Sequence, residues 1–201
     1  MNILLFGGSK GTFFINYLQI RKQRMADFIE EQLRSGLSER DAIHSAKNKF
    51  LIQKFEIDVA NEKVTDTHNE KTDSPGYLIV QASRIIKEYK YTLKFKGDLE
   101  ILNYRPTAYT GVDREAEIDK AESGKDNYIT VTFKCFMNNQ TDFERSKASS
   151  IVNFCDNSNE LNKLIETVNN EIDKDLEAIY KKVVEYMAVT DEFNKKNNII
   201  I

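Results

Sequence analysis

A long apolar seam near the C-terminus constrains the fold of this chain more than any other feature of its sequence. Over residues 159–189 apolar side chains recur in steps of three and four, a spacing that places them all on one side of a helix. The seam consists of Leu161, Ile165, Val168, Ile172, Leu176, Ile179, Val183 and Met187. The opposite side carries Asn169, Asn170, Asp173, Lys174, Glu177 and Lys181. We therefore expect one long amphipathic helix that packs along an apolar surface.

The ends and the period of the seam define this helix further. Asn157 and Glu160 have the spacing of an N-cap and its capping partner, so the helix is expected to start there. The steps from Leu161 to Ile172 repeat from Ile172 to Val183, which gives a period of eleven residues. Such a period lies close to the natural twist of a helix, so we expect a straight helix with little supercoil.

Two shorter helices are predicted near the N-terminus. The first covers about residues 13–34, with an apolar stripe and a stop at Ser35-Gly36. The second begins after its N-cap Ser38 and runs to about Phe50. Its polar side mixes acidic and basic residues, which favours a solvated face over a DNA-recognition helix.

Alternating apolar residues predict a mostly antiparallel sheet of three to five strands. The clearest strand places Tyr89, Tyr91, Leu93 and Phe95 on one face and Lys90, Thr92, Lys94 and Lys96 on the other. We interpret the lysine row as a solvated face or a protected sheet edge. A turn at Gly97-Asp98 is expected to pair this strand with a strand over residues 99–104. Further strands are predicted at 55–59, 128–136 and 151–154. The hydrophilic segment 107–127 is expected to form a long excursion, or a short helix at 114–121.

These elements predict an α+β fold: an N-terminal helix pair, a central sheet, and the long C-terminal amphipathic helix packed on it. We expect four segments along the chain. Residues 1–60 form an N-terminal arm and the helix pair, and 61–76 form a flexible polar loop that ends in Asp73-Ser74-Pro75-Gly76. Residues 77–190 form the α+β core, and 191–201 form a C-terminal tail.

Composition and charge narrow the classes of function. Lys and Arg (29) nearly balance Asp and Glu (32), whereas general nucleic-acid binders carry a basic excess, so a nucleic-acid partner is not expected. Cys135 and Cys155 are predicted to be reduced thiols, with no Cys or His grouping of the kind that holds zinc. The N-terminal apolar run is interrupted by glycines and Lys10, so we expect no signal peptide and no membrane span. The expected location is cytoplasmic, with a virion or another assembled particle as the alternative.

A glycine-rich turn, Gly7-Gly8-Ser9-Lys10-Gly11, follows a short apolar run and precedes the first predicted helix. Backbone N–H groups of such a turn can bind phosphate. The turn resembles the opening of the short-chain dehydrogenases, which implies a nucleotide-binding enzyme. Phe13 stands where that family has its third glycine, and no second parallel strand with an acidic end follows.

A second enzymatic alternative uses Asp73, Glu88 and Lys90, whose order is similar to the Asp…Glu-x-Lys arrangement of metal-dependent nucleases. That chemistry requires both carboxylates on one Mg²⁺ and the lysine beside the attacking water. The simpler interpretation is that Glu88 and Lys90 flank an exposed strand.

The main expectation is a non-enzymatic structural or protein-interaction subunit that forms an oligomer, as in a phage or mobile-element assembly. It rests on an excess of apolar packing surface over catalytic residues, and on the frequency of symmetric self-association. No catalytic, cofactor or metal site is expected. The predicted contact residues lie in the N-terminal arm and the tail: Phe13, Phe14, Leu18, Ile199, Ile200 and Ile201.

Overall fold

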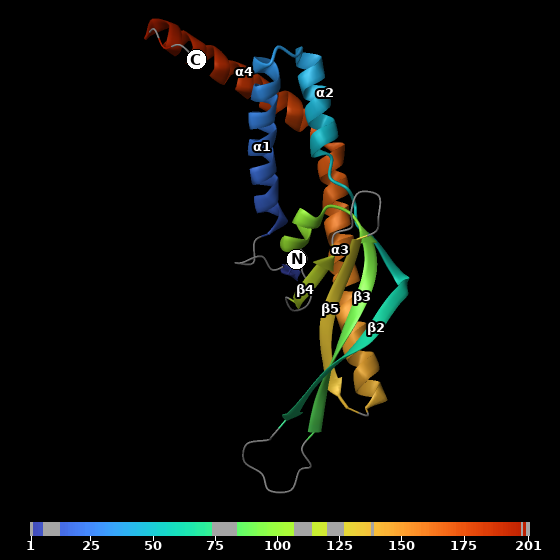
Figure 1. Cartoon of the computed structure of the whole chain (residues 1–201). Coiled ribbons are helices and arrows are strands. Elements are labelled where there is room, and N and C mark those ends of the chain that lie inside the picture. The colour runs from blue at the N-terminus through green and yellow to red at the C-terminus, as the bar shows by residue number, and fades with distance from the viewer. Residues whose placement is uncertain are drawn as a thin grey trace. The chain divides into compact units, whose positions relative to one another are not determined.

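The computed structural model describes residues 2–5, 13–73, 84–106, 114–119, 127–137, 139–197 and 199. In this part the chain has four α-helices and one antiparallel sheet of five strands (Figure 1). The helices are α1 (Phe14–Arg34), α2 (Glu39–Phe50), α3 (Gln140–Asn170) and α4 (Ile172–Lys196). The strands are β1 (Asn2–Leu5), β2 (Glu56–Asp73), β3 (Arg84–Lys96), β4 (Arg114–Asp119) and β5 (Asn127–Phe136). The predicted α+β fold, with two N-terminal helices and a long C-terminal helix, is confirmed.

The chain divides into two compact units, which are described separately. The first, the sheet unit, comprises Met1–Phe13 and Lys54–Lys163, and the second, the helical unit, comprises Phe14–Gln53 and Leu164–Ile201. The division falls within α3, so the structure divides the chain at points other than the predicted loop at 61–76.

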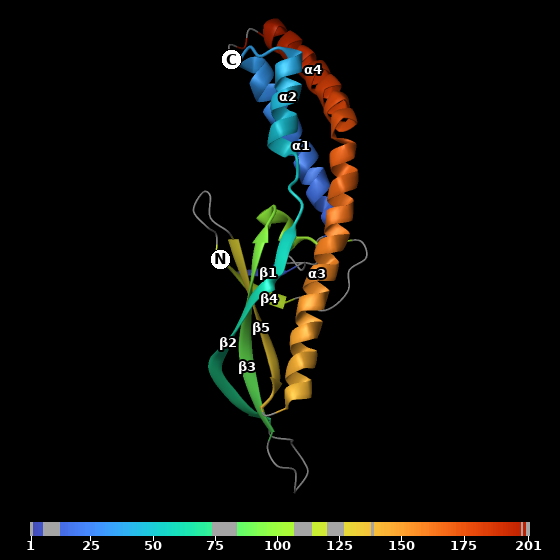
Figure 2. The same cartoon turned by 90° about the vertical axis from the view of Figure 1, so that its right-hand side faces the viewer.

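In the sheet unit the strand order is β1-β4-β5-β3-β2. The alternation in β3 is confirmed, because Tyr91, Leu93 and Phe95 are buried and pair with the equally regular strand β5. Helix α3 lies along one face of the sheet in both views (Figures 1 and 2). It contributes Phe154 and Leu161 to the interior of this unit.

The lysine row of β3 is an inner part of the sheet, so its interpretation as a sheet edge is wrong. Strand β3 lies between β5 and β2, and side chains of its outer face make cross-strand contacts. Lys90 Nζ lies 3.0 Å from Glu117 Oε1, and the hydroxyls of Thr92 and Thr130 are 2.9 Å apart. Each such pair contributes about a few tenths of a kcal/mol to the free energy of folding, so this face is stabilised by several weak interactions together.

Strand β2 continues through most of the segment predicted as a flexible loop. Residues 61–73 belong to β2, and 63–66 and 70–73 are paired with β3, so the loop prediction is wrong there. Residues 74–76 lie outside the described residues. The pairing is interrupted between Asp58 and Lys63 and again between Asp66 and Glu70. His68, in the second interruption, has a φ of 57°. Bulges of this kind twist an edge strand and hinder its pairing with another chain.

The turn after β3 leads into a 3₁₀ helix, η1 (Leu99–Asn103), and not into the predicted hairpin strand. Asp98 caps this helix, accepting a hydrogen bond from Glu100 N at 3.1 Å. Ile101 and Leu102 are fully buried. The period-two interpretation failed because two adjacent buried apolar residues suit a helical turn as well as a strand.

Three further predictions of secondary structure are corrected. Residues 114–119 form strand β4, and 140–154 belong to α3, where a strand at 151–154 had been expected. The long C-terminal helix starts at Gln140 and is interrupted at Glu171, so it consists of α3 and α4. The seam itself is buried or half-buried at all eight positions, as predicted.

In the helical unit α1, α2 and α4 share an apolar core. Its buried members are Met25, Ile29, Ala46, Ile172, Leu176 and Val183. Arg21 is only 2% exposed and lies beside this core. Its guanidinium donates hydrogen bonds from Nε (3.1 Å) and Nη2 (2.6 Å) to the carbonyl oxygen of Phe50. Phe50 is the last residue of α2, so the guanidinium satisfies a carbonyl that the helix leaves unpaired.

Candidate interaction surface

The C-terminal half of α4 exposes three large apolar side chains on one side of the helix. Tyr186 and Phe193 are each 60% exposed and Val189 is 68% exposed. Their spacing of three and four residues aligns them into one stripe. We call Tyr186, Val189 and Phe193 the α4 stripe. It lies beside the buried seam and not on it, because Met187, the last seam residue, points about 100° or more away from each of the three at 3.6 residues per turn.

The path of α1 explains why the α4 stripe is bare. Near the start of α4, Lys22 of α1 forms an ion pair with Asp175 at 2.8 Å. Asp175 and Phe193 are separated by eighteen residues, which is five helical turns, so they project from the same side of α4. At the other end of α1, Arg34 lies 3.9 Å from Asp191, which projects about 160° away from Asp175. Helix α1 therefore crosses from the Phe193 side of α4 to the opposite side before it reaches the level of the α4 stripe.

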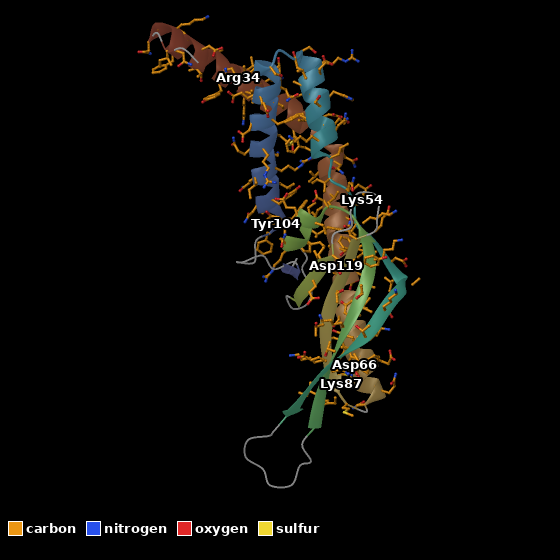
Figure 3. The ribbon with its side chains drawn as sticks, viewed as in Figure 1. Arg34, Lys54, Asp66, Lys87, Tyr104 and Asp119 are labelled. Atoms are coloured by element: carbon orange, nitrogen blue, oxygen red, sulfur yellow. The ribbon has the colours of Figure 1, made fainter. Side chains whose placement is uncertain are left out.

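Figure 1 shows the same relation within the helical unit, where the dark red end of α4 continues beyond α1 and α2. Figure 3 labels Arg34 at the end of α1, next to the crossing with α4. The shared apolar core extends along α4 only as far as Met187. Beyond that residue the apolar side chains of α4 face outward.

Charged residues border the α4 stripe on the flank away from the core. They include Lys181, Glu185, Glu192 and Lys196. Within the helix Lys196 Nζ lies 2.7 Å from Glu192 Oε1. An exposed apolar stripe with a charged border is typical of a contact surface for another protein.

The structure places the predicted contact residues in different environments. Phe13 is exposed and forms an isolated parallel bridge with Arg105. Phe14 is buried and stacks on Tyr17 with 5.6 Å between ring centroids, so its ring is not available to a partner. Leu18 is half-buried and Ile199 is exposed. Ile200 and Ile201 lie outside the described residues.

The glycine turn Gly7–Gly11 also lies outside the described residues. The strand before it, β1, is an edge strand that pairs antiparallel with β4. Dinucleotide-binding folds need a parallel sheet around their first strand. The described sheet is antiparallel, so the fold does not match the one that the dehydrogenase resemblance implies.

The nuclease residues are not brought together. Glu88 is paired with Lys134 at 2.9 Å, whereas Lys90 is paired with Glu117. Asp73 pairs through its backbone with Arg84, four positions before Glu88 on β3, which corresponds to about 13 Å along the strand. This separation exceeds what one Mg²⁺ can bridge with its ligands at about 2 Å.

In the described part of the chain, no group of three or more His, Cys, Asp or Glu side chains is arranged to hold a metal ion. Burial, and secondarily Asp142, raises the pKa of the Cys135 thiol, which disfavours the nucleophilic thiolate. Cys135 borders an open cavity of about 530 Å³ together with Tyr89, Phe136, Asn139, Gln140 and Phe143. None of the described helices is long and apolar enough to cross a membrane.

One surface ion pair gives a testable pH dependence. Lys87 Nζ lies 2.7 Å from Asp66 Oδ2, and Figure 3 labels the two residues next to each other. The hydrogen bond from Lys87, and then that from the His68 backbone, lowers the pKa of the Asp66 carboxyl. Asp66→Asn should therefore lower thermal stability slightly at neutral pH. A depressed folded-state pKa stabilises above the unfolded pKa, so the difference from wild type should vanish as pH falls through the folded-state pKa. Calorimetry from pH 7 to pH 2 measures it, and a pH-independent difference would contradict the assignment.

Comparison with family models, with curated proteins and with solved structures finds no match to this chain. The function is therefore argued from the residues of the chain itself.

Sequence reasoning missed the α4 stripe although its signal was present. Tyr186, Val189 and Phe193 repeat the spacing of three and four just beyond the seam, and Phe193 lies in the segment that was predicted as a tail. The seam and the α4 stripe lie on different sides of the helix, so the period of the seam does not include the stripe.

Proposed function

We propose that this protein is a non-catalytic subunit that assembles with further copies of itself through the α4 stripe. The observation that carries the proposal is the exposure of Tyr186, Val189 and Phe193 together on one side of a helix whose seam residues are buried or half-buried. The exposed apolar side chains on this face of α4 would be buried most simply against the same face of α4 in a second copy. A self-complementary patch then serves both copies at once.

The size of the stripe sets the expected strength of self-association. Fully burying an aromatic side chain removes roughly 150–250 Å² from water, so the three partly exposed side chains offer about 300–400 Å² per copy. A standard interface buries about 800 Å² per partner. The stripe supplies about half of that before the aliphatic stems of Lys182 and Lys196 are added. We therefore expect association in the micromolar range, below that of obligate dimers.

The test is to place a charge in the stripe. Val189→Glu should weaken self-association at least a hundredfold, because each dimer would bury two carboxylates without partners. The helix itself should be unaffected, since Val189 is largely exposed. Sedimentation equilibrium between about 5 and 500 µM measures the mass, and circular dichroism checks the fold.

Ala188→Glu is the matched control. It adds the same charge to the neighbouring, exposed residue, which projects about 130° from the centre of the stripe. Ala188→Glu should self-associate like the wild type. A wild-type chain that stays monomeric up to 500 µM, or a Val189→Glu variant that associates as well as Ala188→Glu, would overturn the proposal.

A further inference from the structure

Resting on the proposed self-assembly, the geometry points to one arrangement of the two helices. We infer that α4 pairs antiparallel with α4 of a second copy, about a two-fold axis near residues 190–191. Val189 then packs against the partner's Phe193, and Glu185 faces the partner's Lys196. Three features of the helical unit lead to this arrangement.

The first feature is the room along the Phe193 side of α4. Near the start of the helix this side is taken by α1, through the Lys22–Asp175 pair. It is bare only from about residue 182 to the helix end at Lys196, a length of roughly 22 Å. Antiparallel helices overlap only along these two bare ends. Parallel helices in register would bring their covered starts together, where the two α1 helices stand in the way.

The second feature is the spacing of the stripe. With an antiparallel axis near 190–191, residues whose numbers add to 381 or 382 lie at the same level. Val189 then meets the partner's Phe193, and by symmetry Phe193 meets the partner's Val189. Each small side chain therefore lies against a large one, which is how packed layers interdigitate. Tyr186 covers the stem of the partner's Lys196.

The third feature is the charged flank, which selects the register. Glu185 and Lys196 are eleven residues apart, about three turns, so they project on the same flank of the stripe. In an antiparallel pair this flank lies against the same flank of the partner. Glu185 of each copy then faces the partner's Lys196, so the dimer has two such contacts. An axis two residues earlier would instead set Glu185 against the partner's Glu192. A parallel pair in register would place this flank against the partner's opposite flank, so Glu185 and the partner's Lys196 would not meet.

The decisive experiment is a charge exchange measured by sedimentation equilibrium. Glu185→Lys and Lys196→Glu should each weaken self-association by roughly tenfold, because two opposite-charge contacts per dimer become repulsive. The double variant should return to within about threefold of the wild type. Lys195→Glu is the control for charge and for helix stability: it makes the same change one residue away, off the flank, and should have little effect.

A distance measurement separates the two helix directions. In a cysteine-free background (Cys135→Ala, Cys155→Ala), spin labels at Lys182→Cys should lie about 25–35 Å apart in the antiparallel dimer and under about 20 Å in a parallel one. Two results would overturn the antiparallel pairing and leave the proposed function standing. One is a chain that self-associates but whose double variant is not restored. The other is a chain that self-associates with the short distance between the labels. A wild-type chain that does not self-associate would overturn both.

Discussion

Gly97→Ala is expected to lower the free energy of unfolding of the sheet unit by about 3 kcal/mol or more. Gly97 has a φ of 129°, a conformation that costs a residue with a side chain about 1–2 kcal/mol. A Cβ there would also lie 2.7 Å from Phe55 Cδ1, 3.0 Å from Lys54 O and 3.1 Å from Phe55 Cα. Two of these three atoms belong to the backbone, so a side-chain rotation cannot relieve the overlap. Overpacking of this kind costs a further 1–3 kcal/mol.

The backbone of Phe55 cannot move away easily, because α3 holds it. Asn162 Oδ1 accepts a hydrogen bond from Phe55 N at 2.7 Å, and its Nδ2 donates to Phe55 O at 2.9 Å. A shift of Phe55 away from position 97 would strain both bonds. The clash and the asparagine amide therefore act on the same residue, and Gly97→Ala combined with Asn162→Ala should cost less than the sum of the two single changes.

Gly36→Ala is the control that separates backbone strain from steric overlap. Gly36 also has a positive φ, of 89°, but no heavy atom lies within 4 Å of its added Cβ. We expect a loss of about 1 kcal/mol there, from strain alone. Urea denaturation of both variants measures the difference. Equal losses of stability at the two glycines would show that steric overlap with Phe55 adds nothing to the cost of a side chain at position 97.

Most of the fold could be predicted from the sequence because its strongest patterns are periodic. The seam from Leu161 to Met187 and the alternation in β3 each fix which face is buried, and both are found as expected. The failures lie where period alone is ambiguous. Residues 61–73 are too polar to look like a strand, yet they pair with β3 through the backbone, which requires no apolar side chain. Residues 99–103 are apolar but too short for their period to be decided.

The asparagines of α3 show a second limit. Asn169 was placed on the solvated side of the seam helix, but its amide donates to Ile52 O at 2.8 Å and accepts from Ile52 N at 3.1 Å. Asn162 makes the same pair of bonds with Phe55. A polar residue on a helix does not reveal whether it faces water or an unpaired backbone segment. The candidate surface was missed for a related reason: exposure of Phe193 depends on where α1 crosses α4, which no local pattern encodes.

Arg21→Ala should lower the free energy of unfolding of the helical unit by about 3 kcal/mol. The sequence suggests a surface residue, since Arg21 begins a basic run with Lys22 and Arg24. The structure instead buries it, and burial lowers the pKa of its guanidinium, an effect that Tyr17 and Asp175 partly oppose. The pKa of an arginine is high enough that the group stays charged. Truncation to alanine would leave the Phe50 carbonyl without its two donors and create a cavity beside the core.

Arg21→Met distinguishes the two parts of this loss. Methionine fills much of the space of the arginine stem and removes the buried charge together with its desolvation cost, so only the bonds to Phe50 are lost. Replacing buried charged groups by apolar ones of similar volume is often nearly neutral. We therefore expect a loss of about 1 kcal/mol for Arg21→Met, against about 3 kcal/mol for Arg21→Ala, in urea denaturation at neutral pH. Equal losses for the two variants would mean that the hydrogen bonds to the end of α2, and not packing, are what Arg21 contributes. In that case the C-terminus of α2 should lose its amide protection in hydrogen exchange to the same extent in both variants.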